Sequence, residues 1–338
     1  MTAGLGSAVR RLWGGSEGSG AAVEAATEQL RQRCALLTAR RRRPGQGGSS
    51  NLYTEVIKAG GQRYFLKAVK PGQDRELRFY SALLGGLVHR EDAHYLIPTP
   101  LLITQTEQST TYLFPFYSVE TLRLPAFLNT PGWSLLRGLA AFNAAHPATP
   151  ALQGCFSVAR FAPDLNHRKL HKAFSSQPRE EVEALYRAIL SCWARVQGQL
   201  EALGLAGSGT DGNGQLALAM NDFNRENAGF IGRGEQRQAV LMDMGRAQLA
   251  PLGHDLRWHF HYICQLQLDL ARLDEVVALY GAALTEHGLR VDPRALTVAG
   301  LAGFVDNWLS QRCLLPSARA PVEQKWQRLQ HKIAFVRA

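Results

Sequence analysis

The segment between residues 217 and 255 constrains the fold of this chain more than any other part. Three short apolar runs lie in or beside it, at 216–220, 228–231 and 239–242, and polar residues or glycine bound each run. Runs of this length between turn signals are typical of buried strands. Because a polar turn at 232–235 separates the second run from the third, we expect these two to pair as a hairpin.

An Asp or Asn residue stands next to each of these runs. Asp222 follows the first run, Asn227 precedes the second, and Asp243 follows the third. Phosphoryl transfer from a metal-bound nucleotide needs one carboxylate for the attacking hydroxyl, and an amide oxygen and a second carboxylate for Mg²⁺. Any one of these residues alone is explained by a turn, which Asp and Asn both favour. All three at strand ends predict Asp222 as the catalytic base and Asn227 and Asp243 as Mg²⁺ ligands.

These motifs resemble a known family. The spacing of Asp222 and Asn227, followed by Asp243 in an Asp-Met-Gly sequence, is similar to the catalytic and metal-binding segments of the protein-kinase-like fold. No Arg precedes Asp222, and residues 251–256 read Pro-x-x-x-Asp-Leu. Both features resemble its small-molecule branch, the aminoglycoside phosphotransferase and choline kinase superfamily.

The chain departs from that family at one place. The family usually has His-Gly before the catalytic Asp, where this chain has Met220 and Asn221. The departure affects the hydrogen bonds that support the catalytic loop. The resemblance also implies that Asp255 is a structural anchor for this loop.

A glycine-rich segment lies far upstream of these motifs. Residues 47–53 read Gly-Gly-Ser-Ser-Asn-Leu-Tyr, and an apolar strand that contains Lys67 follows them. Small residues let a backbone approach phosphates and donate N–H groups to them. Such a segment alone is more often a linker, but Lys67 behind it favours a phosphate loop. The order resembles the nucleotide loop of the family, which implies that Ser49, Ser50 and Asn51 cover the phosphates of ATP.

Lys67 has an expected partner on the next helix. In the kinase-like fold this Lys contacts the α- and β-phosphates and pairs with a Glu. Residues 73–87 have a helical pattern with Glu76 in the first turn, so the resemblance implies a pair of Lys67 and Glu76. Lys70 is the alternative to Lys67. Without the resemblance, Lys67 is a solvated charge on an edge strand, and Glu76 is a charge favoured at a helix N-terminus.

We therefore expect an α+β, two-lobed protein-kinase-like fold, with a small antiparallel β N-lobe of about five strands and a mainly helical C-lobe. The predicted domains are a basic N-terminal extension with a helix (1–46), a nucleotide-binding N-lobe (47–116), and a C-lobe with the catalytic loop and acceptor site (117–338). Residues 114–120 resemble the hinge that meets adenine, and an ordinary strand end with aromatic core residues is the alternative. Amphipathic patterns predict C-lobe helices at 133–146, 178–205, 253–273, 276–286, 293–315 and 322–336.

Two further groups of residues have two explanations each. The segment 161–172 contains two His and three Lys or Arg residues. It is either a solvated helical face or a wall of the acceptor site that favours an anionic substrate. Trp258, His259 and residues 306–308 are acceptor contacts by position, or core packing and capping residues. We expect His146 to be structural.

Composition limits the function classes. The net charge is +10, and residues 1–46 hold eight Arg against three Glu. The run Arg40–Arg43 has no interleaved aromatic residues, so a solvated basic linker explains it, and we expect no nucleic-acid partner. No apolar run approaches the roughly 20 residues that span a bilayer, so we expect no membrane span. The five cysteines are scattered, which indicates reduced thiols and a cytoplasmic protein without a zinc site, and the N-terminus has no apolar secretory signal.

The function implied by the resemblance is transfer of the γ-phosphoryl group of ATP, with Mg²⁺, to a hydroxyl of a small metabolite. A sugar or amino-sugar derivative is the expected acceptor, and an anionic acceptor is the second candidate. Three different functions compete with this one. They are a kinase of a lipopolysaccharide, glycan or protein, a pseudokinase that acts as a binding module, and a nucleic-acid-binding protein that uses the arginine run.

Overall fold

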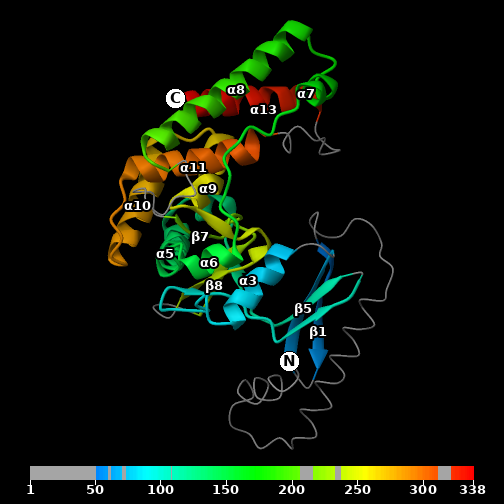
Figure 1. The fold of residues 1–338 in the computed structure, drawn as a ribbon, viewed down its shortest axis with the longest axis vertical. Helices are drawn as coiled ribbons and strands as arrows, with labels where there is room; N and C mark the ends of the chain where they lie inside the picture. The colour runs from blue at the N-terminus through cyan, green and yellow to red at the C-terminus, as the bar shows by residue number, and fades with distance from the viewer. Residues whose placement is uncertain are drawn as a thin grey trace, which may run out of the picture. The chain divides into compact units, whose positions relative to one another are not determined.

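The computed structural model describes residues 51–59, 62–70, 74–107, 109–205, 216–232, 237–310 and 321–338 (Figure 1). The predicted N-terminal extension, its helix, and Ser49 and Ser50 lie outside the described residues. The chain forms two compact units. The first contains the chain up to Glu91 and Leu96–Val119, and the second contains Asp92–Tyr95 and Glu120–Ala338.

The first unit is an antiparallel sheet with one helix. Its strands are β1 (Asn51–Ala59), β2 (Gln62–Val69), β4 (Leu102–Gln105) and β5 (Thr110–Pro115), in the order β1-β2-β5-β4. The helix is α3 (Asp74–Leu84), which follows β2 in the chain (Figure 1). The sequence predicts about five strands here, and the described part of this sheet has four.

Aromatic packing fixes α3 on the sheet. The ring of Tyr80 on α3 lies 5.4 Å from the ring of Tyr112 and 5.4 Å from that of Phe114, both on β5. Phe79 beside it is fully buried. Since residues three and four apart share one face of a helix, Glu76 lies on the same buried face as Phe79 and Tyr80. The apolar packing of α3 therefore also places the Glu76 carboxylate.

The second unit contains two small antiparallel sheets. One has the order β3-β9-β8-β6 and the other pairs β7 with β10. Their bounds are β3 Tyr95–Leu96, β6 Glu120–Thr121, β7 Leu216–Ala219, β8 Ala228–Ile231, β9 Gln238–Leu241 and β10 Gln248–Pro251. The three strands predicted between 216 and 242 are thus present, with β8 and β9 paired in the expected hairpin.

Helices form most of the second unit. They are α4 Leu124–Phe127, α5 Thr130–Ala145, α6 Pro150–Cys155, α7 His167–Ala173, α8 Arg179–Ala202, α9 Arg257–Gln265, α10 Ala271–Glu286, α11 Pro293–Trp308 and α13 Val322–Arg337, with 3₁₀ turns η2 Met244–Arg246 and η3 His254–Leu256. Figure 1 shows α8 and α13 running alongside each other, and the Trp193 indole on α8 donates to the carbonyl of Leu309 after α11 (3.1 Å). These contacts join the helices into one core.

A polar chain inside this core fixes β7. The Tyr280 hydroxyl on α10 donates to Oδ1 of Asn143 on α5 (2.7 Å), and Nδ2 of Asn143 donates to the carbonyl of Leu218 on β7 (2.8 Å). Tyr280, Asn143 and Leu218 are all buried. Buried polar groups need such partners, so the chain holds the strand that leads into Asp222 in one position.

Two glycines let α11 lie directly against the segment that follows β10. A Cβ at Gly303 would lie 2.8 Å from the carbonyl oxygen of His254 in η3. Gly253, with φ +94°, adopts a conformation that suits glycine, and a Cβ there would meet the backbone of Leu296 on α11 at 2.6 Å. The close approach therefore depends on the missing side chains.

The α+β fold class is confirmed, and two predicted helices are wrong in their extent. The helix predicted over 293–315 ends at Trp308. The pattern predicts a single helix over 253–273, but α9 ends at Gln265 and α10 begins at Ala271. Gln267 between them has φ 53°, which no α-helix accepts, and Asp269 Oδ1 accepts from the N–H of Ala271 (3.0 Å) to start the next helix. Within the described ranges, no helix has both the length and the apolar composition needed to cross a bilayer.

Candidate active site

The Asp222 carboxylate is held from several directions. Its Oδ1 accepts from Nδ2 of Asn224 in the same loop (3.1 Å) and from Nε1 of Trp258 on α9 (3.0 Å). Its Oδ2 lies 3.8 Å from Nε of Arg246, and the Asp222 side chain is 17% exposed. The carboxylate is thus oriented by neutral donors at one oxygen, while the other oxygen lies near a cation at the surface.

Asn227 lies against the backbone of Asp222. Its Nδ2 donates to the carbonyl of Asp222 (3.1 Å), and Oδ1 of Asn224 accepts from the N–H groups of Glu226 (2.8 Å) and Asn227 (3.1 Å). These local bonds close the loop between β7 and β8. Because Nδ2 of Asn227 is used in this way, Oδ1 is the end of the amide that suits a cation.

Asp243 follows β9, beside Asn227. The N–H of Met242 donates to the carbonyl of Asn227 (2.8 Å), so the hairpin brings these strand ends together. Asp243 has φ 57°, a left-handed conformation that Asp adopts more readily than most residues and that is enriched at functional sites. A carboxylate and an amide oxygen are the hard donors that Mg²⁺ prefers, so Asn227 and Asp243 fit this ion.

Asp255 anchors the loop before Asp222. Its Oδ2 accepts from the N–H of Met220 (2.9 Å) and its Oδ1 from the N–H of Asn221 (2.6 Å). Burial raises the pKa of Asp255, and the nearby Arg257 guanidinium and these two N–H groups oppose this shift. Burial lowers the pKa of Arg257 to about 10, so its charge at neutral pH supports an ionised Asp255.

Met220 and Asn221, where the chain departs from the family pattern, are still held by hydrogen bonds. Asn221 has φ 60°, where Asn replaces glycine at less cost than most residues. Its Oδ1 lies 3.0 Å from Nε2 of His254, and both side chains are buried. Burial lowers the pKa of His254 to about 3, so the ring is neutral. Since Oδ1 only accepts, Nε2 carries the hydrogen and donates to it.

The predicted nucleotide residues belong to the first unit. Nζ of Lys67 on β2 lies 2.8 Å from Oε1 of Glu76 on α3, and the residues are 6% and 4% exposed. The implied ion pair is therefore present, whereas Lys70 is exposed. Asn51 is the first residue of β1, opposite Val69.

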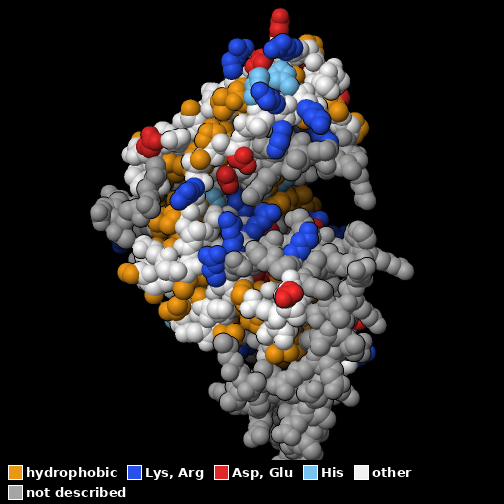
Figure 2. Space-filling model, turned by 45° about the vertical axis from the view of Figure 1, so that its right-hand side comes forward, with side chains coloured by type: hydrophobic (Ala, Val, Ile, Leu, Met, Phe, Trp, Pro, Cys, Tyr) orange, Lys and Arg blue, Asp and Glu red, His pale blue; other side chains and the backbone are white. Residues whose placement is uncertain are grey.

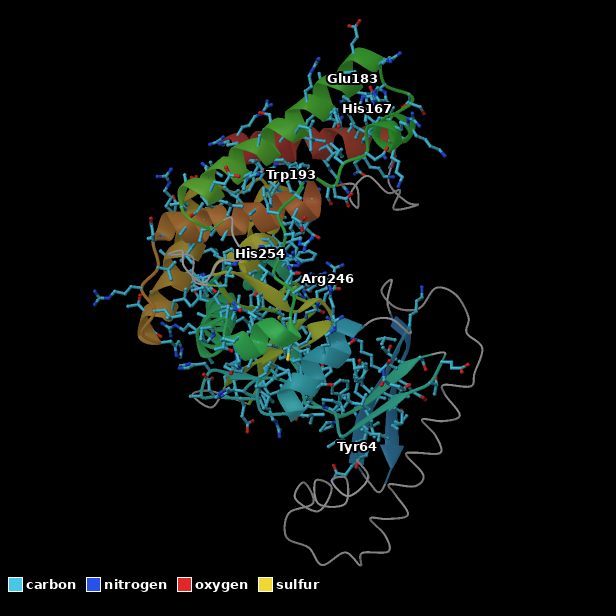
Figure 3. The ribbon with its side chains drawn as sticks, in the orientation of Figure 1. Tyr64, His167, Glu183, Trp193, Arg246 and His254 are labelled. Carbon is cyan, nitrogen blue, oxygen red and sulfur yellow. The ribbon has the colours of Figure 1, made fainter. Side chains whose placement is uncertain are left out.

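Sequence patterns do not reveal three of the side chains near Asp222. Neither Arg246 nor Arg257 is expected near the site, and a core role is favoured for Trp258. Arg246 lies one turn beyond Asp243, in η2, and Arg257 begins α9. Trp258 is separated from Asp222 by 36 positions, and no local pattern indicates that its indole points back to the loop. Figure 3 shows Arg246 and His254 in the second unit.

His259 and Trp308, which have an alternative acceptor role, pack against aromatic rings, and so does His146, which we expect to be structural. His146 is buried, and its Nδ1 lies 2.6 Å from the carbonyl of Phe142. His259 is buried, and its ring lies 4.6 Å from that of Phe127 and 5.8 Å from that of Phe223. Trp308 stacks on His261 at 4.2 Å.

No protein-family model matches the sequence, and no curated protein matches it at a significant level. Several solved structures resemble the fold. The microcompartment-associated aminopropanol kinase aligns with a TM-score of 0.59 and 16% identity over 91% of this chain and 96% of that chain. Spectinomycin phosphotransferase in complex with ADP and spectinomycin gives 0.55 and 13% over 91% and 97%. The ethanolamine kinase of Plasmodium vivax gives 0.51 and 11% over 96% of each chain.

The chain has a protein-kinase-like fold. The expected two-lobed fold class is thereby confirmed. In this kinase-like fold the second unit carries the loop with Asp222 and Asn227 and the hairpin with Asp243. The first unit carries the pair of Lys67 and Glu76.

Proposed function

We propose that this chain is a phosphotransferase that moves the γ-phosphoryl group of ATP to a hydroxyl of a small molecule. One observation carries the proposal. The catalytic-loop carboxylate of Asp222, the amide of Asn227 and the hairpin residue Asp243 occur together in the second unit, in the order that the reaction requires.

Each residue has a proposed role. Asp222 orients the acceptor hydroxyl and accepts its proton. Asn227 and Asp243 hold Mg²⁺, which neutralises charge on the phosphates when bound. Lys67, positioned by Glu76, binds the α- and β-phosphates, and Ser49, Ser50 and Asn51 cover them.

The fold neighbours support a small acceptor. Their names refer to spectinomycin, aminopropanol and ethanolamine, which are small molecules that contain hydroxyl groups. We therefore propose a sugar, amino-sugar or amino-alcohol derivative as the acceptor. Arg246 beside Asp222 favours an acceptor with a negative group as the second candidate, since its side chain is 44% exposed.

The test is ADP release with a panel of amino sugars, amino alcohols and phosphorylated sugars. Asp222→Asn should reduce turnover by at least about 10³-fold while nucleotide affinity stays within about threefold, because only the transition state loses its base. The matched control is Asp274→Asn, the same change at an exposed position in the first turn of α10. Full turnover in Asp222→Asn would refute the assigned role. In a parallel assay with labelled ATP, label transferred only to a glycan or a protein would indicate a macromolecular acceptor instead.

A further inference from the structure

Three metal-ligand side chains converge outside the candidate active site, where α7 meets α8. Nε2 of His167 lies 2.8 Å from Oε1 of Glu183, and Nε2 of His171 lies 3.0 Å from the same oxygen. One donor atom from each of the three residues lies within 4.8 Å of the others. Figure 3 labels His167 and Glu183 at this end of the second unit.

The helices fix this arrangement. His167 and His171 are four residues apart on α7, so both rings leave the same face of the helix. Oδ1 of Asn166 accepts from the N–H of Lys169 (3.1 Å) and caps the helix at its first residue. Leu170 on the same helix is fully buried.

Phe174, which follows the last residue of α7, also anchors this helix. Phe174 is 2% exposed, and its ring meets that of Trp326 on α13 at 5.2 Å. Glu183 belongs to α8, whose buried side packs into the same core. The two imidazoles and the carboxylate are thus presented by packed helices rather than by a loop, which positions them more precisely.

The surroundings leave the cluster accessible. The side chains of His167, His171 and Glu183 are 42%, 25% and 31% exposed. Arg168, Lys169 and Lys172 occupy other, exposed positions of the segment. Figure 2 shows histidine side chains at the surface of this end of the molecule, with Lys and Arg side chains around them.

The separations suit a small divalent ion. Around tetrahedral zinc, with metal–ligand bonds of about 2.0–2.1 Å, neighbouring donor atoms lie about 3.3 Å apart. The observed separations of 2.8 and 3.0 Å need only small side-chain rotations to reach that value.

We propose that His167, His171 and Glu183 form a site for a divalent transition metal, with zinc as the expected occupant. Two imidazoles and one carboxylate suit zinc or cobalt and not Mg²⁺, which prefers oxygen donors alone. The fourth position is open to water. The site links α7 to α8 and shares no residue with the proposed phosphotransferase site, so either can fail without the other.

The experiment is a titration of the full chain with Co²⁺, followed by its visible d–d absorption and by calorimetry with Zn²⁺. The wild type should bind one ion at this site. The melting temperature should rise with Zn²⁺, since the ion binds the folded state.

Two variants remove proposed ligands, and a third is their control. His171→Ala and Glu183→Gln should each weaken Co²⁺ binding at least about tenfold. His89→Ala, an exposed histidine on the first unit, should leave binding unchanged. Circular dichroism shows whether each variant is folded, and Glu183→Gln keeps the volume of the side chain if His171→Ala does not fold.

Two results would overturn the proposal. One is an affinity that is equal in the wild type and in folded Glu183→Gln and His171→Ala. The other is an intense near-ultraviolet thiolate-to-cobalt band without d–d bands from nitrogen and oxygen ligands, which would place the ion on cysteines.

Discussion

At the scale of single residues, the Asp222 carboxylate depends on side chains from distant parts of the chain. Asn224 comes from its own loop, Trp258 from α9 and Arg246 from η2. A carboxylate that orients a hydroxyl must itself be oriented, so these contacts are part of the proposed reaction. Trp258 is the most informative of them because its indole donates one hydrogen bond only.

Trp258→Phe should lower kcat by about 10- to 150-fold and leave the nucleotide KM within about threefold. The variant removes a hydrogen bond to a charged group, which contributes about 1.5–3 kcal/mol, while the aromatic packing remains. Steady-state kinetics measures both constants. Trp326→Phe, the same change on α13, is the control and should keep kcat. Equal kcat values for the wild type and Trp258→Phe would argue against this positioning role.

A second residue-scale prediction concerns pH. Burial lowers the pKa of His254, His259 and His261 to about 3, against 6.5 for an ordinary His. Below pH 6.5 the unfolded chain binds protons that the folded chain does not bind until about pH 3. These histidines therefore do not reduce the free energy of unfolding above pH 6.5, and they reduce it increasingly as the pH decreases from 6.5 toward 3.

His259→Phe should make this fall less steep, by up to about 1.4 kcal/mol per pH unit for one histidine. Neither ring nitrogen of His259 has a hydrogen-bond partner among the described residues, so Phe loses no bond there. Melting temperatures of the variant and the wild type at pH 7 and pH 5 provide the comparison. An identical decrease in both proteins would contradict a neutral, buried His259.

At the scale of elements, the contact between α11 and the segment after β10 holds the anchor of the catalytic loop. Gly303 on α11 faces the backbone of His254, and Asp255 is the next residue. An added methyl group at this point has no space. The helix and the loop anchor are therefore coupled through a single small residue.

Gly303→Ala should destabilise the protein by about 1–3 kcal/mol, because a Cβ would meet the His254 carbonyl at 2.8 Å. The matched control is Gly198→Ala on α8, where nothing lies within 4 Å of the added Cβ. That change should stabilise by about 0.5–1 kcal/mol, since Ala favours helices. Thermal unfolding of both variants decides the matter, and equal stabilities would contradict the close approach.

Sequence patterns locate the elements better than they predict the side-chain contacts between distant elements. The β8–β9 hairpin and Asp222 at the end of β7 follow from short apolar runs and turn residues, which are local signals. The break at Gln267 escapes such patterns because a single left-handed residue leaves the apolar periodicity on both sides intact. The contacts of Trp258 and Arg246 with Asp222 escape them because they depend on how α9 and η2 pack, which no local pattern records.

At the scale of the whole molecule, the proposed reaction needs both units. The first unit contributes the buried pair of Lys67 and Glu76, and the second contributes Asp222, Asn227 and Asp243. The residues proposed for the reaction therefore come from both compact units of the chain. Changes at Lys67 and Glu76 should therefore affect nucleotide binding, and a change at Asp222 should affect turnover.

Glu76→Gln tests this division. Removing one partner of a buried ion pair costs about 3–5 kcal/mol, and here the buried Lys67 loses the carboxylate that lies 2.8 Å from its Nζ. The variant should bind nucleotide at least about tenfold more weakly in calorimetry and should lose stability. Unchanged nucleotide affinity in a folded variant would remove Lys67 from the proposed phosphate contacts.

The measurement that tests the central claim most directly is calorimetry of nucleotide binding, with and without Mg²⁺, on the wild type and Asp243→Ala. We predict Mg²⁺-dependent binding to the wild type and loss of that dependence in the variant, since Asp243 is a proposed ligand of the ion. Absence of nucleotide binding to the wild type under any condition would contradict a phosphotransferase and favour a pseudokinase.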